Sequence, residues 1–201
     1  SVRVNPAVAA SLSVTRSGVG NPLAGVPFSI TVTALDVHGN VATGYNGRVV
    51  FTTDDTHVAP APVLPAPYVF VVGDAGAKVF ANVALYTAGA RTVTATDQAG
   101  IATPAGVLSF TLDGGAATKL RFVQQPTNGV AGVPFTPAVT VEMTDVYDNR
   151  SATAVNVVNI AFETNAGRAL ALGSQATAVA GTATFPSLAV DRPGTGYVLR
   201  A

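Results

Sequence analysis

The sequence predicts an all-β protein built from two tandem β-sandwich modules, and its length, its composition and an internal repeat all point to this fold. With 201 residues, the chain is about twice as long as an ordinary sandwich domain of roughly 100 residues. Hydrophobic residues make up 48% of the chain and charged residues only 11%. The apolar share comes largely from Ala and Val interleaved with Thr, Ser and Gly, a mixture that suits pleated sheets.

The internal repeat is marked by the word AGVPF, which occurs at Ala24 to Phe28 and again at Ala131 to Phe135, 131 − 24 = 107 residues later. The similarity extends in both directions, from SLSV matching KLRF to AGAKVFANVAL matching AGTATFPSLAV. Self-similarity at this spacing indicates two copies of one folding unit. We therefore expect a first domain at 6–114 and a second at 115–201. A very short linker at 113–117, DGGAA, favours an elongated rod with limited bending.

Strands are predicted because the dominant period within the repeat is two. Ile30 and Val32 alternate with hydroxyl side chains, and Val139 and Val141 keep the same phase in the second copy, as in strands with one buried face. The stretch 78–85 could also be a short helix. Its second copy contains a proline, which costs about 3 kcal/mol in a helix interior, so we expect a strand in both copies.

The inward-facing apolar positions of these strands define an expected core for each module. For the first module they are Leu12, Phe28, Ile30, Val32, Phe51, Phe80, Val93, Leu108 and Phe110. For the second they are Leu120, Phe122, Phe135, Val139, Val141, Ile160, Phe162, Phe185 and Leu199.

The order of the repeated words carries a family resemblance. AGxPF entering a strand, a D-x-x-G-N turn, a VxF strand and an AG…F…L stretch together resemble the bacterial Ig-like, invasin/intimin-like tandem repeats of adhesins and surface proteins. The resemblance covers both copies and implies immunoglobulin-like Greek-key β-sandwiches of seven strands. It also implies an extracellular or cell-surface protein that acts as a structural or adhesive spacer, with neighbouring repeats as its partners and no active site.

Charge and residue usage argue against several other functions. Eleven basic residues balance eleven acidic ones, and no Lys/Arg cluster occurs. The sequence therefore contains no concentration of positive charge that would attract nucleic acid or an anionic membrane. No apolar run reaches the 18 residues that a membrane span requires. The chain has no cysteine, and His38 and His57 lack further ligands at metal-binding spacing. Asp54 and Asp55 point to opposite sides of an extended chain and are expected to end a strand. We predict no catalytic, cofactor or metal residues.

Two alternatives concern ligands. Asp and Asn oxygens, which are suitable ligands for Ca²⁺, cluster in the turns Asp36–Asn40 and Asp145–Asn149. The alternative is that these residues only stabilise the turns, because Asp and Asn are also ordinary turn formers. The alternative function is an accessory carbohydrate-binding module of a secreted protein. Such a module stacks sugars on aromatic faces, and Tyr45 and Tyr147 are the only tyrosines placed in or beside turns.

The proline-rich segment Ala59–Pro67, APAPVLPAP, has no counterpart in the second copy. Alternate prolines favour extended geometry and cannot donate ladder hydrogen bonds. We expect a surface connection or a cover for a sheet edge, with a ligand for a proline-binding groove as the alternative.

The phase of the repeat predicts an incomplete second copy. SVRVNP at Ser1 aligns with SFTLDG at Ser109, so residues 1–5 resemble the last strand of a preceding module. At the other end, Ala201 aligns with Ala95, and the counterpart of Asp97–Leu112 is missing. The second copy is thus one strand short. The gap would be filled either by the continuation of a longer repeat array or by strand donation between copies arranged head to tail.

Overall fold

The computed structural model describes residues 1–201 and divides into two compact units, Ser1–Asp113 and Gly114–Ala201. Strands are the only regular elements apart from η1 (Val72–Asp74), a three-residue 3-10 turn. The predicted all-β class is therefore confirmed. No helix in the structure has the length and apolar character needed to cross a bilayer.

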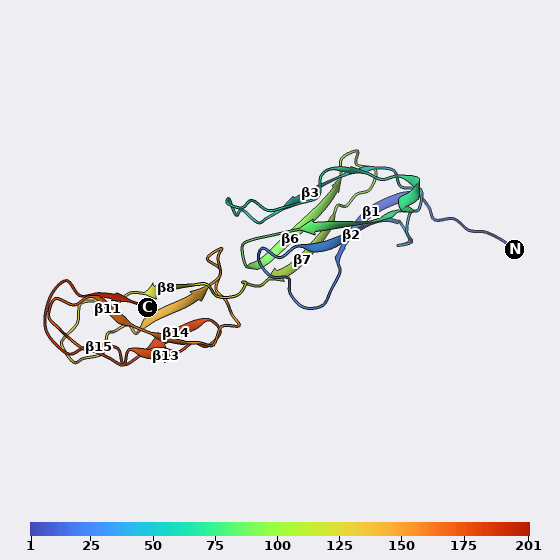
Figure 1. Ribbon diagram of the computed structural model, residues 1–201. Coiled ribbons are helices and arrows are strands. Elements are labelled where there is room, and N and C mark those ends of the chain that lie inside the picture. Colours follow the sequence, from blue (N-terminus) through green and yellow to red (C-terminus); the bar gives the residue numbers. More distant parts are fainter. The chain divides into compact units, whose positions relative to one another are not determined.

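The first module is a sandwich of two antiparallel sheets (Figure 1). One sheet has the order β1-β2-β5, and the other has the order β4-β3-β6-β7. This division of seven strands is the immunoglobulin-like Greek-key arrangement. The bounds of the strands are β1 (Ala9–Arg16), β2 (Phe28–Asp36), β3 (Arg48–Thr53), β4 (Tyr68–Val69), β5 (Ala77–Val83), β6 (Gly89–Asp97) and β7 (Gly106–Leu112).

The core of the first module lies between these two sheets. Ile30 and Val32 of β2 are completely buried, as the period of two predicts. Two edge-to-face ring pairs join the sheets, Phe51 with Phe80 at 4.8 Å and Phe28 with Phe110 at 5.5 Å between centroids. Among the predicted core residues Leu12, Ile30, Val32, Phe80 and Val93 are buried, and Phe28, Phe51, Leu108 and Phe110 are half-buried.

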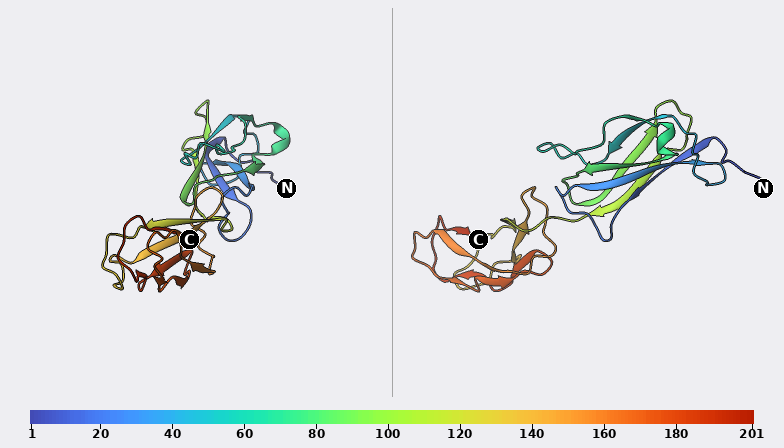
Figure 2. Two further views of the ribbon diagram at one scale, coloured as in Figure 1. Left: turned by 60° about the vertical axis from the view of Figure 1, so that its left-hand side comes forward. Right: turned by 45° about the vertical axis from the view of Figure 1, so that its right-hand side comes forward.

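The second module repeats the first sheet and only part of the second. The sheet β14-β9-β8 matches β5-β2-β1, whereas β11 and β16 form a pair with no third strand in the place of β7. Two further pairs, β10 with β13 and β12 with β15, complete the module. Figure 2 shows each module from two further sides. The bounds are β8 (Lys119–Gln124), β9 (Val139–Thr144), β10 (Val157–Asn159), β11 (Ala161–Thr164), β12 (Ala171–Leu172), β13 (Gln175–Thr177), β14 (Thr182–Phe185), β15 (Ala189–Val190) and β16 (Val198–Arg200).

The core of the second module contains most of the residues predicted for it. Val139, Val141, Ile160 and Phe185 are buried, and Phe122, Phe135 and Leu199 pack against them half-buried. Phe162 is also half-buried, with its ring 5.5 Å from that of Tyr197.

The prediction for Leu120 is wrong, because its side chain is 41% exposed whereas that of its counterpart Leu12 is 5% exposed. The difference arises from the segment that leads into β7. The N–H of Leu12 donates to the carbonyl of Pro104 at 3.2 Å, and a Cβ on Gly106 would meet Leu12 and Val14 within 3.1 Å. None of the residues 114–201 makes the corresponding contacts with Leu120.

The repeated AG words also have a structural cause. Ala75 and Gly76, like Ala180 and Gly181, have positive φ angles. A Cβ on Gly76 would lie 2.5 Å from the carbonyl oxygen of Ala42, and one on Gly181 would lie 2.3 Å from that of Ser151. These turns therefore require glycine both for backbone angle and for space.

The proline-rich segment covers the end of the edge strand β5. Val63 and Ala84 exchange two backbone hydrogen bonds of 2.8 and 3.0 Å, so the expected role as an edge cover is confirmed. The segment does have a counterpart in position, which the sequence comparison missed. In the second module Leu172 of β12 pairs with Ala189 of β15 in the equivalent place.

Candidate functional site

The repeated turn after the second strand of the first module is organised around one buried carboxylate. Asp36 ends β2, and its residue surface is 4% exposed. Its Oδ1 accepts the backbone N–H groups of His38 and Asn40, each at 2.9 Å. Its Oδ2 accepts the N–H of Ala7 at 3.0 Å and the Asn40 side-chain amide at 3.2 Å. The carboxylate thus ties its own turn to the segment that enters the module.

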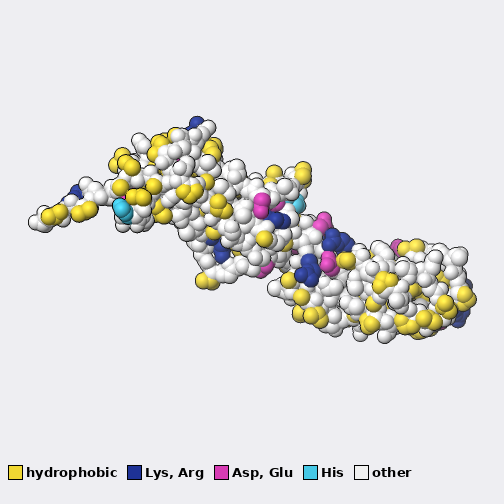
Figure 3. Space-filling model, turned by 180° about the vertical axis from the view of Figure 1, so that it is seen from behind, with side chains coloured by type: hydrophobic (Ala, Val, Ile, Leu, Met, Phe, Trp, Pro, Cys, Tyr) yellow, Lys and Arg dark blue, Asp and Glu magenta, His cyan; other side chains and the backbone are white.

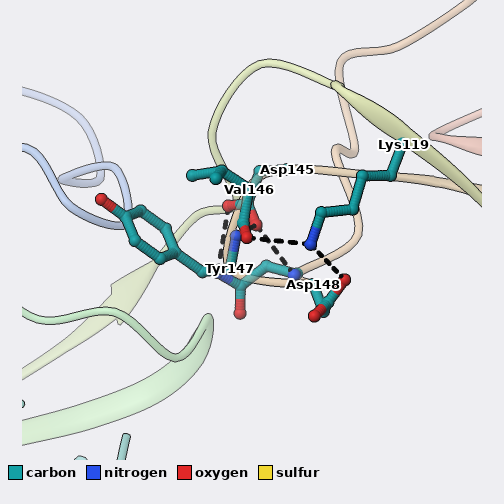
Figure 4. A network of polar contacts seen from close by, with 6 residues as sticks. Lys119, Asp145, Val146, Tyr147 and Asp148 are labelled. Carbon is teal, nitrogen blue, oxygen red and sulfur yellow. Dashed lines mark hydrogen bonds and ion pairs between the residues drawn. The ribbon is translucent and has the colours of Figure 1, made fainter. Parts of the chain in front are cut away.

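The second module repeats this arrangement at Asp145, which is 2% exposed. Oδ1 accepts the N–H groups of Tyr147 and Asn149, each at 2.9 Å, and Oδ2 accepts the N–H of Gly115 at 2.8 Å and the Asn149 amide at 3.0 Å. Figure 4 shows this turn with the Lys119 ammonium beside it. Lys119 donates to the carbonyl of Val146 at 3.0 Å and pairs with the exposed Asp148 at 2.9 Å. We call Asp36 and Asp145 the anchor aspartates.

Electrostatics at the first anchor favour the charged carboxylate. Burial by itself would raise the pKa of Asp36, but the N–H donors of Ala7, Asn40 and His38 stabilise the ionised form more strongly, and together they lower the pKa to about 2. The anchor therefore remains an anion over the whole physiological pH range.

The anchor carboxylates are better suited to holding backbone N–H groups in place than to binding a cation. Ca²⁺ takes six to eight oxygen ligands, whereas both oxygens of each anchor carboxylate already accept N–H donors. The structure contains no group of three or more His, Cys, Asp or Glu side chains arranged to hold a metal ion.

The adjacent pair Asp54 and Asp55 ends β3, as the sequence predicts, and each residue fastens a different segment. Asp54 accepts the N–H of Thr92 at 2.8 Å. Asp55 is buried and accepts the N–H groups of Tyr86 and Thr87 at 2.6 and 3.2 Å and the Thr87 hydroxyl at 2.7 Å. Burial would raise the pKa of Asp55, but these donors outweigh it and lower the pKa.

His38 lies in the turn after β2, and His57 lies in the irregular segment that follows β3. The N–H of His38 donates to Asp36, and its side chain is exposed. His57 is half-buried, with its Nδ1 2.8 Å from the carbonyl oxygen of Pro60 and its ring 5.6 Å from that of Tyr86. Both residues therefore make hydrogen bonds within their own local segments.

The interpretation of Tyr45 as a sugar platform is wrong. Its side chain is 4% exposed, and its ring packs edge-to-face against Phe70 with 5.0 Å between centroids. Burial and, after it, the neighbouring Asp97 carboxylate raise the pKa of Tyr45. The second platform candidate, Tyr147, is half-buried in the anchor turn.

Sequence reasoning missed the link between each anchor aspartate and the entry segment. The signal was present, since an Asp followed four residues later by Asn recurs at the end of the second strand in both copies. That pattern predicts a turn stabilised by its own side chain. It carries no information about Ala7 or Gly115, which the fold brings to the same carboxylates from about 30 residues away.

Comparison with known proteins yields structural likenesses only. No family model matches the chain, and no curated protein matches it. Similar solved structures include the Escherichia coli adhesin FdeC, at 17% identity and a TM-score of 0.42 over 96% of this chain and 64% of that one. Another is Yersinia pseudotuberculosis InvD, at 16% identity and a TM-score of 0.42 over 93% of this chain and 56% of that one.

Part of an enzyme chain also appears among these likenesses. A family 2 glycosyl hydrolase of Bacteroides cellulosilyticus is 14% identical, with a TM-score of 0.32 over 90% of this chain and 25% of the hydrolase. Our chain spans less than two thirds of each of these three proteins. Likenesses this weak assign neither a family nor a function.

Proposed function

We propose that this chain is a structural spacer of an extracellular or cell-surface adhesive protein. Each sandwich module is one repeat unit of that spacer. The observation that carries the proposal is the repeated anchor, because both modules use a buried aspartate to hold the backbone that enters them. Ala7 is held by Asp36, and Gly115 is held by Asp145. A spacer needs such fastening, since any pull along the chain acts first where the backbone enters a module.

The exit from the first module is fastened as well. The N–H of Asp113 donates to the carbonyl of Pro22 at 2.9 Å, and its carbonyl accepts the N–H of Ala24 at 2.8 Å. Entry and exit lie at opposite ends of this module (Figure 1). A force applied to the two ends would therefore act along the strands and shear many backbone hydrogen bonds between them at the same time. This geometry supports a mechanical role for the module.

The surface supports the same proposal. Charged residues make up only 11% of the chain, and on the face shown in Figure 3 they are few, with basic and acidic side chains next to one another. Such a surface offers no concentrated field to a charged partner. The partners that we propose are neighbouring repeats of the same kind.

Single-molecule pulling on residues 1–201 tests the proposal. We expect two separate unfolding events, and in Asp36→Ala one of them should occur at a lower force because the entry segment is no longer held. Val37→Ala is the matched control, since Val37 lies in the same turn with its side chain 74% exposed. Modules that extend without measurable resistance, or an Asp36→Ala chain that unfolds like the control, would contradict a load-bearing spacer. Specific hits on a glycan array would favour the carbohydrate-binding alternative instead.

A further inference from the structure

A short connection in the first module joins the anchor turn of Asp36 to β3. The N–H of Tyr45 donates to the carbonyl of Ala42 at 3.0 Å. The carbonyl of Gly47 accepts the N–H of Phe70, also at 3.0 Å. The buried ring of Tyr45 folds back over Gly47, and a Cβ on this glycine would overlap the ring. Residue 47 must therefore be glycine for reasons of space.

The second module contains the same connection without the ring. At the offset of 145 − 36 = 109 residues between the anchor aspartates, Ala154 takes the place of Tyr45, and Asn156 takes that of Gly47. The backbone bond is retained, since the carbonyl of Asn156 accepts the N–H of Ala178 at 3.0 Å. The tyrosine ring, and not the course of the backbone, is thus the reason for a glycine in the first module.

This glycine has a chemical consequence for Asn46, the residue before it. Asn is thermolabile, because the backbone nitrogen of the next residue can attack its side-chain carbonyl carbon. A side chain on that next residue hinders the attack, and glycine has none. The side chain of Asn46 is exposed and makes no hydrogen bond, and the N–H of Gly47 donates to no other group. Both reacting groups are therefore available.

We propose that Asn46 is a site of spontaneous deamidation. The backbone nitrogen of Gly47 forms a bond to Cγ of Asn46, and its proton leaves with the side-chain amide as ammonia when the Cγ–Nδ2 bond breaks. Water then opens the cyclic imide at either carbonyl, which yields aspartate or isoaspartate. The reaction needs no co-reactant other than water. This proposal concerns the chemistry of the connection and does not depend on the spacer function.

Isoaspartate would change the first module locally. In this product the main chain runs through the former side chain, so one additional methylene group separates the Cα of residue 46 from Gly47. Gly47 is held by the ring of Tyr45 and by the N–H of Phe70, and the added length must displace it from one of them. Strand β3 begins at the next residue and pairs with β6. We therefore expect the modification to loosen β3 and β6.

Peptide mapping by mass spectrometry tests whether the reaction occurs. The full chain carries Asn128→Gln, which removes the other Asn-Gly pair, and is sampled over several weeks in mildly alkaline buffer. Asn82 is the internal reference, because it is exposed in the same module and precedes Val83. We expect Asn46 to lose its amide about tenfold faster than Asn82, since a branched side chain hinders the attack there. Equal rates at the two positions would overturn the proposal.

Hydrogen exchange tests whether the product loosens the module. After conversion, amides of β3 and β6 should exchange roughly tenfold faster than before, and amides of β9 and β14 should keep their rates. Asn46→Gln is the matched control, because its longer side chain closes a ring far more slowly, and its exchange should stay constant over the same period. Asn46→Asp adds the charge without lengthening the main chain and should also keep the original rates. An Asn46→Asp chain as loose as the converted one would refute the displacement of Gly47.

Transfer of the site to the second module tests the role of the glycine. Val155 is 66% exposed and precedes Asn156, whose backbone bond matches that of Gly47. The double variant V155N/N156G should lose the introduced amide at a rate similar to that of Asn46, whereas V155N alone should react about tenfold more slowly. If the two variants reacted alike, the following glycine would not control the reaction, and the proposal would be wrong.

Discussion

Replacing the second anchor aspartate, Asp145→Asn, should destabilise the second module although the side chain keeps its size. The Asn Oδ1 can still accept the N–H groups of Tyr147 and Asn149, as the carboxylate does at 2.9 Å. The new amide nitrogen, however, takes the place of Oδ2. It would face the Gly115 N–H and the Asn149 amide, which now donate to Oδ2 at 2.8 and 3.0 Å.

The expected magnitude follows from these two lost bonds. A hydrogen bond to a charged group contributes about 1.5–3 kcal/mol. The two losses should not add fully, because the Gly115 N–H is only partly buried and water can replace one acceptor. We expect the free energy of unfolding of the second module to fall by about 3 kcal/mol, which is roughly a hundredfold in the unfolding equilibrium constant.

Hydrogen exchange measured by mass spectrometry on the whole chain can separate the two modules. In Asp145→Asn, amides of β9 and β14 should exchange roughly a hundredfold faster, and amides of β2 and β6 should keep their rates. The matched control is Asp148→Asn, the same chemical change three residues further along. Asp148 has an exposed side chain paired with Lys119, and such surface pairs contribute about 0–1 kcal/mol. If the two variants exchanged alike, the anchor argument would be wrong.

Three other predictions concern the first module and the turns. Because the pKa of Asp36 is lowered from 3.8 to about 2, its ionised form stabilises the folded module above about pH 4, and this stability is lost as the pH falls toward 2. A melting curve series should show this loss, with a weaker pH dependence in Asp36→Asn. Phe110→Ala removes a half-buried ring from its contact with Phe28 and should lower the free energy of unfolding by about 2 kcal/mol, less than the 3–5 of a fully buried ring. Denaturant titration that shows no change would contradict that packing. Added Ca²⁺ should produce no calorimetric heat and no shift in melting temperature, whereas binding at the turn of Asp145 would show that the anchor also holds a cation.

Much of the fold could be predicted because it depends on local patterns. Alternation of apolar and hydroxyl side chains predicts β2 and β9, and the two AGVPF words predict two modules. The burial of Ile30, Val32, Val139 and Val141 follows directly from that alternation.

The errors occurred where burial depends on a distant segment. Leu120 has the right phase for a core residue and yet is exposed, since no segment covers it as the chain before β7 covers Leu12. Tyr45 follows a glycine in a turn and yet is buried against Phe70. Phase and turn composition describe a residue's own strand or turn, and neither reports what packs on top of it.

The sequence by itself determined the all-β class, the duplication and the positions of the turns, because strand period and turn chemistry are properties of adjacent residues. Only the tertiary structure decided what those turns do. It brings Ala7 to Asp36 across 29 positions of the chain, and it brings Phe110 to Phe28 across 110 − 28 = 82 positions. Hydrogen bonds and ring contacts of this kind need two distant segments to meet within a few ångströms, and no local pattern in the sequence specifies that meeting.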